Sequence, residues 1–150
     1  DEATAFLGRV ADLVGRDGGL LIGIDRKKEP AVIEAAYNDS LGVTAAFNLN
    51  ILRRLNDIGA DFDLGGFRHE APYRPAEGRI EMHLVSQRAQ SVRIGDSSID
   101  FAAGERIVTE HSHKYDLDQF EAMARSAGFR LSRHWSDERD WFSVCFLEVV

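Results

Sequence analysis

The sequence predicts an α/β fold that carries an α+β insertion in its middle. Three observations support this prediction. The chain opens with a helical pattern, a Gly18-Gly19 turn and the apolar run LLIGID, the order of half a turn of an α/β sheet. Residues 67–113 read as strands separated by turn signals, which is typical of an antiparallel meander. The chain closes with a helix and two apolar strands, which we expect to join the sheet begun at the start.

The composition is that of a single soluble globular domain. The chain has 150 residues, of which 44% are apolar and 29% charged, so it can bury a core and is unlike a disordered chain. The formal charge of −7 argues against nucleic-acid partners and anionic membrane surfaces. The single Cys145 excludes an intramolecular disulfide. There is no signal peptide and no apolar run of the ~20 residues that span a bilayer, so we expect a cytoplasmic protein.

Two elements are predicted before the insertion. Residues 3–15 form an amphipathic helix, because apolar side chains recur at helical spacing: Phe6, Leu7, Val10, Leu13 and Val14. LLIGID, residues 20–25, is a short and continuous apolar run bounded by glycine. A half-exposed strand would alternate instead, so this run is predicted to be a buried parallel strand.

The insertion is predicted to begin with two helices and to continue as strands. Pro30 suits the first position of the helix PAVIEAAY, which Asn38, Asp39 and Gly42 break. A second helix covers about residues 43–58 and stops at Gly59. Two hairpins follow, with turns at PAEG and at Gly95-Asp96. In RIEMHLVSQ, apolar side chains alternate with Glu81 and His83, which predicts one buried and one wet face.

After the strand RIVTEHSHKYD, a helix begins at Asp116 and is closed by Gly128. FRLSRHW and WFSVCFLEV are predicted as the last two strands.

The strand RIVTEHSHKYD, residues 106–116, ends in an unusual run of polar side chains. Strict alternation would place Val108, Glu110 and Ser112 on one face. The other face would carry Ile107, Thr109, His111 and His113. A carboxylate beside a hydroxyl suits a ligand with two different polar nitrogens, such as a neutral imidazole. The alternative is a solvated strand end, which the spacing alone favours because charged side chains are mostly exposed.

Other candidate sites have less support. His111 and His113, with His69 and His83, could bind a metal, but no metal-binding spacing accompanies them, so no metal is expected. Gly18-Gly19 and Gly65-Gly66 match no phosphate loop. Cys145 lies in an apolar strand without basic neighbours, which indicates a core thiol. Tyr37 could project a phenol into a cleft, although its position fits a structural tyrosine better.

Three stretches resemble the histidine-specific S-adenosylmethionine (SAM)-dependent methyltransferases of the ergothioneine pathway, which trimethylate the α-amine of histidine. They are LLIGIDRKKEPAVIEAAYNDSLGVTAAFNLNILRRLN, RIEMHLVSQRAQSV and DFAAGERIVTEHSHKY. The similarity runs in order along nearly the whole chain. Its most specific motifs are AYNDSLGVTAAFN and TEHSHK.

The resemblance implies an architecture and a set of site residues. Residues 1–27 and 115–150 would be late parts of a Rossmann-like class I methyltransferase sheet, and residues 28–114 an inserted α+β substrate-recognition domain. SAM would be the cosubstrate and an amino acid the small-molecule substrate. Tyr37 would bind the substrate carboxylate, Glu110 and Ser112 would bind the imidazole, and Met82 would line the imidazole pocket. Such a pocket can reject substrates without the matching N–H groups by up to about 10⁴-fold.

The resemblance also implies parts that this sequence does not contain. They are the first strand with its glycine-rich turn, which should hold SAM, and the asparagine that should meet the substrate amine. The chain also begins at Asp1 without a methionine. We therefore expect the C-terminal portion of a longer enzyme, inactive alone, with no assignable general base or cofactor-binding residue. Open sheet edges predict a dimer or strand exchange. The alternatives are a methyltransferase for another amino acid and a non-catalytic amino-acid-binding or assembly module.

Overall fold

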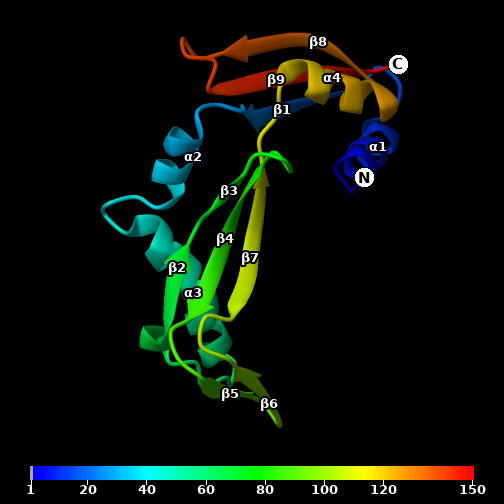
Figure 1. Cartoon of the computed structure of the whole chain (residues 1–150). Helices are drawn as coiled ribbons and strands as arrows, with labels where there is room; N and C mark the ends of the chain where they lie inside the picture. Colours follow the sequence, from blue (N-terminus) through cyan, green and yellow to red (C-terminus); the bar gives the residue numbers. More distant parts are fainter. Residues whose placement is uncertain (1) are drawn as a thin grey trace. The chain divides into compact units, whose positions relative to one another are not determined.

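The computed structural model describes residues 2–150, which divide into two compact units (Figure 1). Unit 1 ends at Lys28 and resumes at His113, and unit 2 is Glu29–Ser112. Unit 1 contains α1 (Glu2–Val14), β1 (Gly19–Asp25), α4 (Leu117–Ser126), β8 (Phe129–Ser136) and β9 (Phe142–Val149). Unit 2 contains α2 (Pro30–Tyr37), α3 (Val43–Asp57), the 3-10 turn η1 (Leu64–Gly66), β2 (Phe67–Glu70), β3 (Tyr73–Arg74), β4 (Arg79–Ser86), β5 (Gln90–Ile94) and β6 (Ser97–Phe101). Strand β7 (Arg106–His113) ends at the boundary.

The predicted helices are confirmed, and both units combine helices with antiparallel sheets. Within residues 2–150, no helix is long and apolar enough to cross a membrane.

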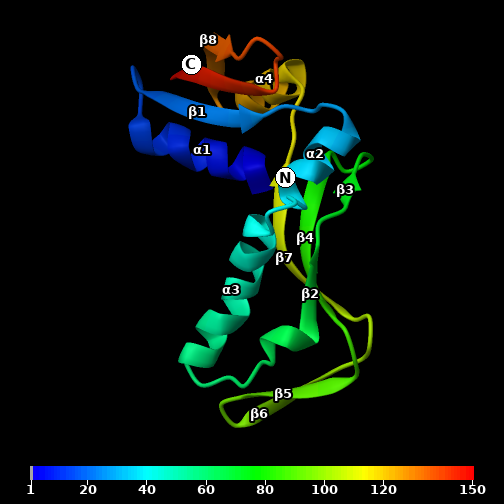
Figure 2. The same cartoon turned by 90° about the vertical axis from the view of Figure 1, so that its left-hand side faces the viewer.

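Unit 1 is a three-stranded antiparallel sheet with helices packed on one face. The strand order is β1-β9-β8, and β1 pairs with β9 from Gly19↔Glu148 to Asp25↔Phe142. Figure 2 shows α1 running along β1. The core between helices and sheet consists of Leu7, Ala11, Ile24, Phe120, Ala124, Phe129, Cys145 and Leu147. The predicted core thiol is confirmed, since Cys145 is fully buried and this burial raises its pKa.

The prediction that LLIGID is a buried parallel strand is wrong for the described residues. β1 pairs antiparallel with β9, and parallel pairing occurs only beyond its end, in a bridge between Arg26 and Tyr115. Leu21 is 63% exposed, and Trp135 and Phe142 of this sheet are about half exposed. The apolar run is continuous because one face packs on the helices while its other apolar side chain, Leu21, lies on a face that residues 2–150 leave exposed.

The chain leaves unit 1 and returns to it along two adjacent segments. The backbone N–H of Tyr115 donates to Asp25 O (2.9 Å), and that of Lys27 donates to Tyr115 O (3.2 Å). Ion pairs join the same segments: Lys114–Asp25 (2.7 Å) and Lys27–Asp116 (2.7 Å). Residues 25–28 and 113–116 are therefore held side by side by both backbone and charge.

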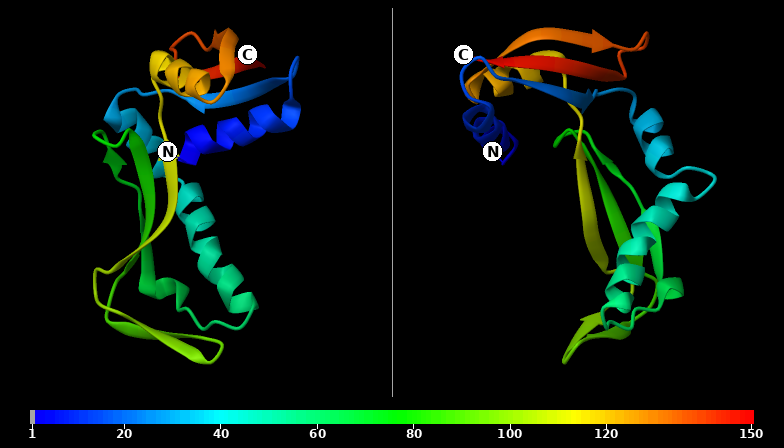
Figure 3. Two further views of the ribbon diagram at one scale, coloured as in Figure 1. Left: turned by 90° about the vertical axis from the view of Figure 1, so that its right-hand side faces the viewer. Right: turned by 180° about the vertical axis from the view of Figure 1, so that it is seen from behind.

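Unit 2 is built around β4, which is buried along nearly its whole length. β2 and β3 pair with successive halves of β4 along one edge, and β7 pairs with β4 on the other. The first predicted hairpin is confirmed, but its first strand is interrupted at Pro72, which has no N–H to donate. Helices α2 and α3 cover one face of this sheet, and the β5–β6 hairpin is a separate two-stranded ribbon (Figure 3). Ile33 and Leu52 supply the helix contacts to β4.

Candidate functional site

The end of α2 places the Tyr37 phenol. Asn38 closes the helix, because its backbone N–H donates to Glu34 O (2.8 Å). Its side chain pairs with both backbone groups of Ala71, donating to the carbonyl (2.8 Å) and accepting from the N–H (3.0 Å). The last turn of α2 is thereby fixed to the segment between β2 and β3.

The start of α3 is fixed by Asp39. Its carboxylate accepts hydrogen bonds from the backbone N–H groups of Val43 (2.9 Å) and Thr44 (2.8 Å). These bonds satisfy donors that a helix start leaves unpaired, and they lower the pKa of Asp39 to about 2. The two residues predicted to break the helix, Asn38 and Asp39, thus fix the ends of both helices around Tyr37.

Three of the four predicted site residues come together. The Tyr37 hydroxyl donates to Ser112 Oγ at 2.8 Å, which joins α2 to β7. Met82 is 3% exposed, in a small core with Ile33, Ala71 and Ile80, and Tyr37 packs against this core. The phenol therefore spans from the core around Met82 to the hydroxyl of Ser112.

Glu110 lies two residues before Ser112 on β7 and is exposed. Within residues 2–150, its carboxylate makes no hydrogen bond or ion pair. The carboxylate is therefore open to a ligand, and the same exposure is expected of the solvated strand end considered above.

The predicted alternation of β7 is wrong at its polar end. Thr109 and Ser112 were expected on opposite faces, yet Thr109 reaches Asn48 of α3 and Ser112 reaches Tyr37 of α2. Both helices cover the same face of the sheet. The exposure pattern also breaks, because Glu110 and His111 are exposed in succession. The strand is thus irregular where its polar side chains lie.

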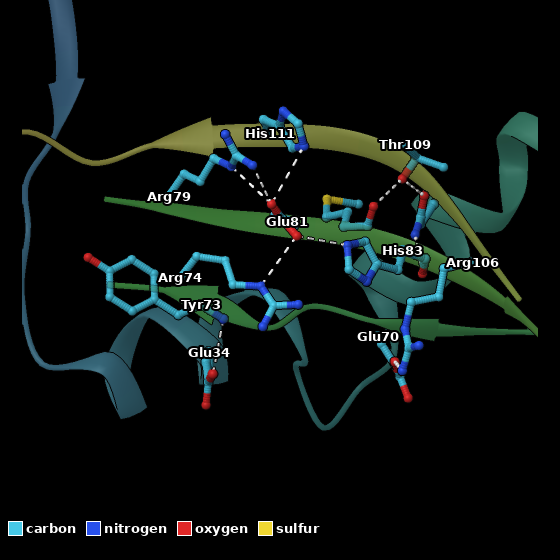
Figure 4. A network of polar contacts seen from close by, with 12 residues as sticks. Glu34, Glu70, Tyr73, Arg74, Arg79, Glu81, His83, Arg106, Thr109 and His111 are labelled. Carbon is cyan, nitrogen blue, oxygen red and sulfur yellow. Dashed lines mark hydrogen bonds and ion pairs between the residues drawn. The ribbon is translucent and has the colours of Figure 1, made fainter. Parts of the chain in front are cut away.

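The other face of the sheet carries a charged network that the sequence pattern did not predict (Figure 4). Glu81 forms ion pairs with Arg79 (2.6 Å) and Arg74 (3.4 Å), and its carboxylate lies 3.1 Å from His83 Nε2 and 3.7 Å from His111 Nε2. Glu81 and His83 are only 9% and 2% exposed, so the wet face predicted for this strand is wrong. Alternation gave the direction of these side chains but could not show that arginines from β3 and β4 itself would cover them.

Glu81 gives a pH prediction. The hydrogen bond from Arg79 outweighs burial and lowers the pKa of Glu81 from 4.5 to about 2. The folded-state pKa lies below the unfolded value, so the stability that this carboxylate contributes is fully present above pH 4.5 and is lost as pH falls towards 2. Glu81→Gln should lower the free energy of unfolding at pH 7 and converge with the wild type near pH 2, as measured by urea denaturation. Glu77→Gln, at an exposed turn, is the control, and parallel wild-type and Glu81→Gln profiles would contradict the prediction.

The four histidines considered as metal ligands do not share one common partner. His69 binds a buried amide, His83 and His111 adjoin Glu81, and the His113 ring stacks with that of Tyr115. Across the described chain, no group of three or more histidine, cysteine, aspartate or glutamate side chains is arranged to hold a metal ion.

Comparison with known protein families identifies the family of this chain. Residues 1–149 match the profile of the family described as histidine-specific methyltransferase, SAM-dependent. The chain belongs to the histidine-specific, SAM-dependent methyltransferase family. The resemblance identified from the sequence motifs is thereby confirmed.

The relatives of this chain include proteins named as a histidine methyltransferase and as a tryptophan methyltransferase. A histidine N-alpha-methyltransferase of Mycolicibacterium smegmatis is 42% identical over 93% of this chain and 44% of its own length. Ergothioneine biosynthesis protein 1 of Neurospora crassa is 29% identical over 90% of this chain and 15% of its own. L-tryptophan methyltransferase trpM of Psilocybe serbica is 29% identical over 89% of this chain and 38% of its own. The chain thus spans less than half the length of these relatives.

Proposed function

We propose that this chain is the amino-acid-recognition part of an enzyme that uses SAM to methylate the α-amino group of L-histidine. In this proposal Tyr37 binds the substrate carboxylate, Glu110 and Ser112 bind the imidazole, and Met82 lines the imidazole pocket. Methyl transfer to an uncharged amine needs chiefly the in-line positioning of nucleophile and methyl group, which can contribute several kcal/mol and up to about 7–11 kcal/mol.

The Tyr37–Ser112 hydrogen bond is the observation that supports this proposal most directly. It brings a phenol and a hydroxyl from distant parts of the chain to 2.8 Å, and an exposed carboxylate, Glu110, lies two residues before Ser112 on the same strand. A carboxylate and a hydroxyl can pair with the two ring nitrogens of a neutral imidazole, since one nitrogen donates and the other accepts.

The fit of the described residues to SAM is partial. The carboxylate at the end of β1, Asp25, is occupied by Lys114 (2.7 Å) and Lys28 (2.6 Å). No glycine-rich turn follows a parallel strand within residues 2–150, and such a turn is the usual nucleotide-binding feature of these sheets. The residues of this chain therefore bind the amino acid, and SAM binding requires parts of the enzyme other than these residues.

The test is an assay of the full-length parent protein with SAM and each of several amino acids, with the product identified by mass spectrometry. Methylated histidine is expected. Calorimetric titration of SAM into the chain of 150 residues alone should show little or no binding. Micromolar SAM binding by this chain would contradict the proposal that SAM needs further elements. Histidine binding without methylation by the parent would contradict the proposed activity and favour a non-catalytic amino-acid-binding module.

A second candidate is a methyltransferase for another amino acid. The similarity to the L-tryptophan methyltransferase of Psilocybe serbica favours it, because that relative covers 89% of this chain. Higher kcat/KM for tryptophan than for histidine in the same assay would select this candidate.

We also propose that unit 1 is part of a Rossmann-like sheet and that unit 2 is a domain inserted into it. The exposed apolar face around Leu21 and the unpaired edge of β1 support this, because such surfaces are normally covered or paired. The isolated chain should therefore dimerise or exchange strands through this edge. Light scattering over a concentration series measures this, and a monomer at high concentration would argue against it.

A further inference from the structure

A buried polar chain crosses unit 2 on its helix-covered face. Asn48 of α3 has no exposed surface, and all its polar atoms are used. Its Oδ1 accepts from the Thr109 hydroxyl (2.6 Å), and its Nδ2 donates to His83 O (3.1 Å) and to His69 Nδ1 (3.0 Å). The other ring nitrogen, His69 Nε2, lies 2.8 Å from the backbone oxygen of Tyr37.

The partners fix the direction of every bond in this chain. The Tyr37 carbonyl can only accept, so His69 Nε2 carries a proton. The His83 carbonyl can likewise only accept, so the Asn48 atom 3.1 Å from it is the amide nitrogen, and His69 Nδ1, which faces the same nitrogen, must be the acceptor. The Thr109 hydroxyl then lies against Asn48 Oδ1 (2.6 Å) and Met82 O (3.0 Å), both of which accept. Protons thus point in one sense from Thr109 through Asn48 and His69 to Tyr37, with a donor and an acceptor at each step.

This chain closes a ring of contacts that passes through Tyr37 and Ser112. Its two ends are Tyr37, whose phenol binds Ser112, and Thr109, which immediately precedes Glu110. The backbone of β7 from Thr109 to Ser112 completes the ring. The ring therefore fixes the end of α2 and the irregular segment of β7 against each other. Buried networks that are fully paired in this way hold side chains in one arrangement.

We infer that Asn48 and His69 are positioning residues for amino-acid recognition: they hold the Tyr37 phenol in register with Glu110 and Ser112. This rests on the proposed function, because Tyr37, Glu110 and Ser112 are its substrate-binding residues. Asn48 has no exposed surface and both ring nitrogens of His69 are hydrogen-bonded within the protein. The two side chains therefore act through Tyr37, so we expect an effect on affinity for the amino acid and not on affinity for SAM.

The experiment compares four variants of the full-length parent protein. His69→Phe keeps a ring but removes both hydrogen bonds, whereas His69→Gln can still accept from Asn48 and donate to Tyr37. Thr109→Val removes the first donor with little change in volume. Ser86→Ala is the matched control, because Ser86 is 1% exposed in the same unit and its hydroxyl bonds Arg88 O and Gln90 outside the ring. Each is titrated with L-histidine and with SAM by calorimetry.

We expect His69→Phe and Thr109→Val to weaken histidine binding roughly 10-fold, as for loss of a buried hydrogen bond. His69→Gln should retain most of the affinity, Ser86→Ala should bind normally, and SAM affinity should be unchanged throughout. Folded His69→Phe or Thr109→Val with wild-type histidine affinity would overturn the inference, as would equal losses of histidine and SAM binding. If His69→Phe fails to fold, Thr109→Val and His69→Gln decide.

A readout without substrate separates this inference from the proposed function. The Tyr37 ring carbon bonded to the hydroxyl gives a ¹³C signal in labelled protein, which Tyr37→Phe assigns. This signal should shift in His69→Phe and not in Ser86→Ala, whether or not the wild type binds histidine. A wild type without histidine binding would refute the proposed function, whereas an unmoved Tyr37 signal would refute the positioning role.

Discussion

Glu110→Ala in the full-length parent enzyme should weaken histidine recognition by roughly 10- to 150-fold, the equivalent of losing a charged hydrogen bond of about 1.5–3 kcal/mol. The variant removes an ionised acceptor and leaves an imidazole nitrogen unpaired, while no contact within residues 2–150 depends on this carboxylate. The loss should be specific to histidine. A substrate with an apolar ring should lose much less, or gain from the vacated space. The measurement is kcat/KM for histidine and for tryptophan.

Two comparisons make this prediction decisive. Glu77→Ala removes another exposed carboxylate of unit 2 and should leave kcat/KM unchanged for both histidine and tryptophan. Ser112→Ala should cost less than Glu110→Ala, because a neutral hydroxyl is the weaker partner. If Glu110→Ala lowers kcat/KM equally for histidine and tryptophan, Glu110 has a structural role. If kcat/KM is unchanged for both, the solvated strand end is the correct interpretation.

Asp25→Asn should lower the free energy of unfolding by about 3 kcal/mol, because it removes the ion pairs of Asp25 with Lys114 and Lys28. The Lys114 side chain has no exposed surface, whereas that of Asp25 is 32% exposed. Burial raises the pKa of Asp25, but hydrogen bonds and charges from Lys114 and Lys28 outweigh it, and the net pKa is lowered. Asp25 is therefore ionised at neutral pH. Urea denaturation of the wild type and the variant at pH 7 measures the loss.

The neighbouring pair Lys27–Asp116 supplies the control. Its side chains are 34% and 59% exposed, so Asp116→Asn should cost no more than about 1 kcal/mol. The double variant Asp25→Asn/Lys114→Met should recover part of the loss, because the ammonium of Lys114, whose side chain has no exposed surface, is then removed as well. If Asp25→Asn is as stable as Asp116→Asn, the Lys114–Asp25 pair contributes no more to the free energy of unfolding than the exposed Lys27–Asp116 pair.

The helices and the positions of the strands were predictable because periodicity reports local structure. Helical spacing in residues 3–15 and turn residues at Gly95-Asp96 identify elements without knowledge of their neighbours. LLIGID was mispredicted for the same reason. An apolar run indicates that both faces suit an apolar environment, but it does not identify the strand that pairs with it or whether a second layer is present.

The candidate site was only partly predictable, because its geometry depends on contacts between distant residues. The motifs gave Tyr37, Met82, Glu110 and Ser112, but not the irregularity of β7 or the covered Glu81. Asn48 did leave a signal. It lies four residues before Leu52, on the buried side of α3, where an amide is unfavourable unless it is fully hydrogen-bonded. A polar residue on an apolar helix face indicates a buried partner, although the sequence does not identify which one.

The adjacent segments 25–28 and 113–116 also have a consequence for modular exchange. Because Arg26 and Tyr115 are bridge partners, the chain enters and leaves unit 2 through neighbouring points of unit 1. A segment with such closely spaced ends can be removed and its gap closed by a short linker at little entropic cost. Residues 29–112 could therefore be transplanted between relatives as a cassette. If unit 2 recognises the amino acid as proposed, grafting the corresponding segment of the tryptophan enzyme should transfer substrate preference while leaving unit 1 unaltered.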